Sequence, residues 1–248
     1  METQAFEFPM LFLLIHFSIY LVGYFIVFRK WSPETRPEAS SCFMSLFHGT
    51  PAAVVATAAI LSARSSNLAA ANTRFQNLVL DYSTAYFVAD LVHLAVFFGG
   101  ADDAMFLTHH LATLFVLVTC RDVAAHGAVA VLALLALGEA TNAFLDAWML
   151  ARARRSEAPR AARVCDALTV PFCCLYSVIR GVFGPCVVFR MVVVYSRGGG
   201  EGVIATWVWV SWVVVVSFAI VGSLVWVSFL CVEVYRERTK KFEEKIQS

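Results

Sequence analysis

Long apolar runs constrain this chain more than any other feature of its sequence. A helix needs about 20 mostly apolar residues to cross the hydrocarbon core of a bilayer, and only helices or closed barrels satisfy the backbone there. The 248 residues are 60% hydrophobic and 15% charged, with a mean hydropathy of +0.72, whereas a soluble domain is about 45–50% apolar. We therefore predict an all-α, multi-pass transmembrane helical bundle.

The sequence predicts about seven spans, with six as the lower count. They cover residues 8–28, 41–62, 82–98, 105–120, 124–150, 168–195 and 203–234. The third and fourth runs are at the short end for a span, and the fifth is long enough to cross the bilayer at a tilt. We divide the chain into a first span and loop at 1–40, the main bundle at 41–235 and a basic tail at 236–248.

The distribution of Lys and Arg predicts the orientation, because cytosolic loops carry an excess of these residues. Of the 17 Lys and Arg outside the predicted spans, 13 lie on one side of the membrane and 4 on the other. This bias places the N-terminus in the lumen or outside and the C-terminal tail in the cytosol. An odd number of spans agrees with that arrangement.

Two adjacent histidines, His109 and His110, lie inside an apolar run. Ionisable residues are rare in the membrane and indicate a functional site, although each imidazole could serve only to hydrogen-bond a neighbouring helix. The preceding span carries Tyr86, Asp90 and His93 at spacings of i, i+4 and i+7, which place all three on one helical face. Acids near the bilayer centre must face the bundle interior and find partners there.

The fifth predicted span repeats this pattern with Glu139, Asn142 and Asp146 at i, i+3 and i+7. His48 lies in the second predicted span and Arg180 in the sixth. On the predicted topology, five spans contribute polar groups to the cytosolic half of one bundle. We therefore predict that these side chains meet in a shared polar interior.

Four stretches of the chain resemble the TLC-domain family, which includes the ceramide synthases. They are residues 45–49, 82–91, 109–113 and 139–146, and the resemblance covers roughly residues 40–235. It implies a TLC-type barrel of helices with a polar interior and a lipid-accessible cavity, usually in the endoplasmic reticulum. The chain resembles the smaller TLC-domain proteins more closely than the synthases.

In the ceramide synthases, paired histidines and an Asp-x-x-Asp element serve acyl transfer from acyl-CoA to a sphingoid amine. His109 and His110 match the histidine pair. Glu139 occupies the first place of the acidic element, and Asn142, which cannot ionise, occupies the second. Asp146 falls where the synthases often carry Glu.

Two hypotheses for function follow. In the first, the protein binds, senses or handles lipids and contributes to membrane lipid homeostasis. The polar lining of the lipid site would then comprise His48, Tyr86, His93, Asn142, Asp146 and Arg180. In the second, it is an acyl-CoA-dependent N-acyltransferase with acyl-CoA as co-substrate, in which a histidine acts as base or nucleophile. The catalytic residues would then be His109, His110, Asp90 and Glu139.

A seven-span receptor or transporter is a third possibility with less support. No lysine falls inside a predicted span, which excludes a retinal Schiff base, and six histidines are too few for a membrane di-iron enzyme. We predict no metal and no cofactor, and seven cysteines without a Cys-x-x-Cys pair indicate core packing. The expected partners are membrane lipids rather than nucleic acid, and the sequence does not identify any protein partners.

Overall fold

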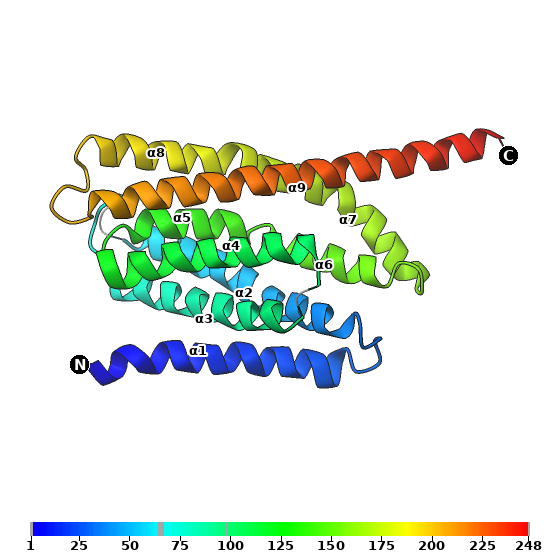
Figure 1. The fold of residues 1–248 in the computed structure, drawn as a ribbon, viewed down its shortest axis with the longest axis horizontal. Helices are drawn as coiled ribbons and strands as arrows, with labels where there is room; N and C mark the ends of the chain where they lie inside the picture. Colours follow the sequence, from blue (N-terminus) through cyan, green and yellow to red (C-terminus); the bar gives the residue numbers. More distant parts are fainter. Residues whose placement is uncertain (1, 64–66, 98, 248) are drawn as a thin grey trace.

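The chain forms an all-helical bundle in the computed structural model, which describes residues 2–63, 67–97 and 99–247 (Figure 1). Within these residues, seven helical segments are long and apolar enough to cross a membrane. The predicted fold class is confirmed. The two chain ends lie at opposite ends of the bundle, and the last helix extends beyond it (Figure 1).

The helices follow one another with short connections, and three of them contain a π-helical turn (η). The bounds are α1 Glu2–Val22, η1 Gly23–Val27, α2 Arg36–Leu61, α3 Arg74–Phe97, α4 Ala101–Val118, η2 Thr119–Ala124, α5 Ala128–Glu139, α6 Asn142–Ala153, α7 Pro159–Val178, η3 Ile179–Phe183, α8 Gly184–Ser196 and α9 Thr206–Gln247.

Helix α2 lies at the centre of the packing and contacts α1, α3, α5 and α6. Its buried face carries small residues, among them Ala52, Ala56 and Ala59. Small side chains let helix backbones approach closely, which is how helices associate in a membrane that offers no hydrophobic driving force between them. On the other side of the bundle α4 packs on α3 and α9, and α8 packs on α5 and α9.

The third span is longer than predicted, because α3 begins at Arg74 rather than at residue 82. The added turns contain polar residues that find partners inside the protein. The side chain of Gln76 accepts a hydrogen bond from the backbone N–H of Thr73 at 2.9 Å, and Asp81 pairs with Arg121 at 3.0 Å. The predicted final residue, Phe98, lies outside the described residues.

The fifth span differs from the predicted long, tilted helix, because it consists of two helices, α5 and α6, separated at residues 140–141. The hydroxyl of Thr141 donates a hydrogen bond to the carbonyl of Gly138 at 3.0 Å. A Thr side chain that bonds a nearby carbonyl competes with the helical ladder and bends the chain. The break falls between Glu139 and Asn142, two of the predicted site residues.

Candidate functional site in the bundle interior

A cavity of about 1490 Å³ lies within the bundle. It is lined by nine of the ten predicted site residues: Tyr86, Asp90, His93, His109, His110, Glu139, Asn142, Asp146 and Arg180. These residues come from α3, α4, α5, α6 and η3. The tenth, His48, contacts the lining residues from behind. The structure thus brings the polar residues of five spans together, and their role stays a prediction.

The second histidine of the pair, His110, faces Asp90 across the α3–α4 contact. Its Nε2 lies 2.8 Å from Asp90 Oδ2, although the N–H does not point straight at that oxygen. Its Nδ1 lies 2.8 Å from the carbonyl of Phe106 one turn earlier. The hydroxyl of Ser41 donates to the other oxygen of Asp90. Both side chains of the pair are buried, so the carboxylate is held by two partners away from water.

Glu139 is also held by two partners. The side-chain amide of Asn142 donates to Glu139 Oε2 at 2.7 Å, and His48 Nδ1 lies 3.4 Å from the same oxygen. His48 Nε2 contacts the hydroxyl of Ser83 at 3.2 Å. The break between α5 and α6 brings the carboxylate and the amide together, because both side chains flank it. Asn142 therefore serves Glu139 as a neutral hydrogen-bond donor.

Aromatic rings surround His48. Its imidazole is stacked on Tyr86, with centroids 3.9 Å apart and an angle of 7° between the planes. His16 of α1 packs edge-on against it at 5.8 Å and also contacts Tyr82 at 5.0 Å. His16 is not among the predicted site residues, although it is fully buried. The signal was present, because His16 is itself an ionisable residue inside an apolar run.

Two further predicted residues line the cavity in different settings. His93 Nδ1 lies 3.1 Å from the hydroxyl of Tyr20, so α1 reaches the site at a second point that the sequence did not indicate. Asp146 is buried at 4% exposure, and its Oδ2 has no hydrogen-bond partner. An acceptor left without a partner in this environment is free to bind a donor from a ligand.

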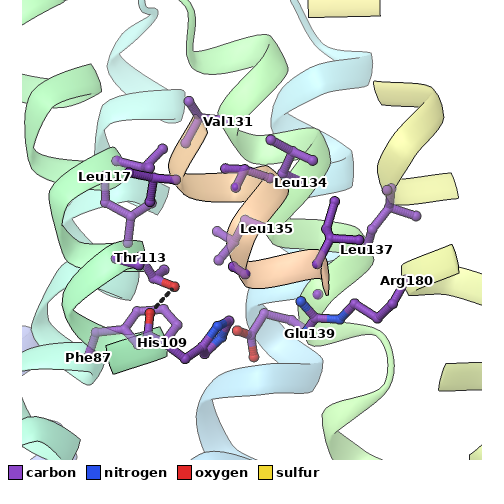
Figure 2. Close-up of a pocket in the computed structure, with 18 of the residues that line it drawn as sticks. Phe87, His109, Thr113, Leu117, Val131, Leu134, Leu135, Leu137, Glu139 and Arg180 are labelled. Atoms are coloured by element: carbon purple, nitrogen blue, oxygen red, sulfur yellow. Dashed lines mark hydrogen bonds between the residues drawn. The ribbon is translucent and has the colours of Figure 1, made fainter. Parts of the chain in front are cut away.

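The first histidine of the pair, His109, points in a different direction from His110. It lines a smaller apolar recess of about 90 Å³ that continues from the cavity, together with Glu139 and Arg180. Figure 2 shows these three side chains pointing into the same space, with Leu117 and Val131 on the apolar side. The recess and the cavity together therefore offer a polar surface next to an apolar one.

No group of three or more His, Cys, Asp or Glu side chains within the described residues could hold a metal ion. The polar lining instead consists of histidine–carboxylate contacts, an arginine and an amide. Such groups bind polar head groups through hydrogen bonds and charge.

Comparison with known proteins gives two matches to this chain. The family model described as the TLC domain matches residues 38–232, which begin with α2 and exclude α1. A TLC domain-containing protein of Arabidopsis thaliana is 50% identical over 223 residues, which cover 89% of this chain and 87% of that protein. No solved structure matches the chain.

Proposed function

Because this chain belongs to the TLC-domain family, we propose that it binds membrane lipids in its interior cavity and in this way contributes to membrane lipid homeostasis. The proposed location is the endoplasmic reticulum membrane, as the resemblance to the family implies. The protein would act as a lipid-binding, sensing or handling component, and its ligands would enter from the bilayer around it.

The cavity is the observation that carries this proposal. It measures about 1490 Å³ and lies among helices that are long and apolar enough to span a membrane. Its walls combine apolar side chains with buried ionisable groups, and such groups within spans mark ligand pathways and binding sites. Ligand pockets in proteins are typically 300–1,000 Å³ with a few convergent polar groups, so this one is large enough for an amphipathic molecule.

The contacts of the two histidines support binding more than acyl transfer. Both ring nitrogens of His110 already face an acceptor, Asp90 and the carbonyl of Phe106. His109 points into the recess, but the described residues supply no carboxylate within 4.0 Å to orient its ring. A nucleophile or base normally needs a third group to hold it. For the acyltransferase alternative, His109 could therefore contact a substrate in the recess, but no acid within the described residues orients its ring.

Native mass spectrometry of the purified protein tests the proposal. We expect one lipid molecule to stay bound when detergent is stripped in the gas phase, and we expect a matched protein with the cavity blocked to lose it. A folded, monodisperse protein that retains no lipid from any membrane extract would contradict lipid binding. Acyl-CoA-dependent amide formation by the same preparation, abolished by His109→Ala, would favour the acyltransferase instead.

A further inference from the structure

An arginine and an aspartate of the cavity lining, Arg180 and Asp146, each have a buried polar atom without a hydrogen-bond partner. Arg180 lies near the middle of the span Pro159–Ser196, in the π-helical turn η3. Its Nε is buried without a hydrogen-bond partner, and the described residues place no carboxylate oxygen within 4.0 Å of its guanidinium. An unpaired charge inside a membrane bundle is unfavourable, so Arg180 needs a negative partner.

The surroundings of Arg180 keep its guanidinium open to the cavity. Its Nη2 lies 3.5 Å from the point that a Cβ on Gly138 would occupy, so the absence of a side chain there lets it lie against α5. The guanidinium carbon lies over the ring of Tyr176, 5.3 Å from the ring centroid. Glu139 also lines the recess, but its Oε2 already accepts a hydrogen bond from Asn142 and lies next to His48 Nδ1.

Asp146 provides an acceptor elsewhere in the lining of the same cavity. It is buried and lines the cavity, and its Oδ2 has no partner. Its carboxyl group shares a side-chain hydrogen bond with Ser45. Two other carboxylates of the lining are also held, Asp90 by His110 and Glu139 by Asn142. Within the described residues, the cavity lining therefore offers a guanidinium without an ion-pair partner and a carboxyl oxygen without a hydrogen-bond partner. A ligand that carries both a negative group and an N–H donor would satisfy the two together.

We propose that the cavity binds a zwitterionic lipid whose phosphate pairs with Arg180 and whose primary ammonium group donates to Asp146. This inference rests on the proposed lipid binding and names the class of head group. The planar guanidinium matches the oxygens of a phosphate. Asp146 Oδ2 needs a hydrogen-bond donor. The ammonium group of ethanolamine supplies one and also carries the positive charge of a zwitterion, whereas a quaternary choline has neither N–H nor O–H to donate. The apolar recess beside Arg180 receives hydrocarbon next to the head group.

A competition experiment tests the head group directly. The purified protein is incubated with equal amounts of phosphatidylethanolamine, phosphatidylcholine and phosphatidylglycerol that share the same acyl chains, and bound lipid is counted by native mass spectrometry. We expect phosphatidylethanolamine to be enriched about tenfold over each competitor, which corresponds to about 1.4 kcal/mol, near the lower end of the range for a hydrogen bond to a charged group. Arg180→Gln and Asp146→Asn should each remove most of that enrichment.

Matched controls come from the span Pro159–Ser196, which also contains Arg180. Arg190→Gln changes an exposed arginine of α8, and Asp166→Asn changes an exposed aspartate of α7. Neither residue lines the cavity, so both variants should bind like the wild type. Arg180→Gln and Asp146→Asn remove charge from a span, which makes insertion less costly, and gel filtration with a thermal melt checks that they fold. Arg180→Lys keeps the positive charge but loses the planar guanidinium with its paired N–H donors, and we expect this variant to retain part of the binding.

The outcomes separate this proposal from the one on which it rests. Equal binding of all three lipids, unchanged in both variants, would overturn the head-group assignment and leave lipid binding in place. Preference for phosphatidylglycerol, lost only in Arg180→Gln, would identify an anionic lipid and also overturn it. No bound lipid of any kind in the folded wild type would overturn lipid binding itself.

Discussion

At the residue scale, the contact between Asp90 and His110 is the best-defined polar pair of the interior. The two atoms are 2.8 Å apart, and both side chains are less than a tenth exposed. Removing one partner of a buried charge pair leaves the other uncompensated, whereas removing both can be nearly neutral. The pair thus fixes how α3 and α4 sit against each other without requiring a catalytic role.

We predict that Asp90→Leu and His110→Leu each lower the free energy of unfolding by about 3–5 kcal/mol, and that the double variant loses much less than the sum. Thermal unfolding in detergent, followed by size-exclusion chromatography, measures all four proteins. Strictly additive losses would show that the two side chains do not interact.

Asn142 permits a second prediction at this scale. Its amide donates to Glu139 at 2.7 Å, and an ionised Asp in its place would put two carboxylates together and remove the donor. We expect Asn142→Asp to lower the free energy of unfolding by about 1–3 kcal/mol, and more than Asn142→Ala does. We also expect no gain in acyl-CoA-dependent amide formation. A rate increase in Asn142→Asp would count in favour of the acyltransferase.

At the element scale, α9 borders the route by which a lipid would reach the cavity. Gly222 of α9 is exposed and lines the cavity. A Cβ added there would meet nothing within 4 Å. This position can therefore accept a larger side chain without a clash, and we expect it to lie at the mouth of the cavity.

We predict that Gly222→Trp keeps the fold and reduces the bound lipid several-fold, because the indole would fill the mouth. Val225→Trp is the control, since Val225 is 50% exposed on the same helix and does not line the cavity. Native mass spectrometry and a thermal melt compare the two variants. Full lipid occupancy in a folded Gly222→Trp protein would show that ligands enter elsewhere.

At the scale of the whole molecule, the predicted orientation places the C-terminal end of α9 in the cytosol, because 13 of the 17 Lys and Arg outside the predicted spans lie on that side. The N-terminus and the C-terminus lie at opposite ends of the bundle (Figure 1). On this orientation, the basic loops lie at the cytosolic end of the bundle. The residues Asp90, Glu139 and Arg180 then lie in the cytosolic half, close to the middle of the bundle.

A glycosylation acceptor engineered after Arg236 tests this orientation. We expect it to stay unmodified in microsomes, whereas an acceptor before Phe8 should be modified. Modification of the tail acceptor would reverse the topology, and with it the leaflet from which ligands enter.

The sequence by itself determined the class of the fold and the polar residues of the interior. Apolar length is a local property, so the seven spans could be read without knowledge of packing. The spacing of Tyr86, Asp90 and His93 likewise placed three polar groups on one face of α3. The predicted start of α3 was wrong by eight residues, because the polar side chains in its first turns have partners inside the protein. Gln76 is bonded locally to Thr73, and Asp81 is paired with the distant Arg121.

Only the tertiary structure decided which partners meet. His109 and His110 are neighbours in sequence, but successive residues of a helix are rotated by about 100°, so His110 faces Asp90 and His109 faces the recess. The break between α5 and α6 joined Asn142 to Glu139, and α1 brought His16 against His48. These contacts depend on the rotation and position of whole helices, which packing fixes and local sequence periodicity does not.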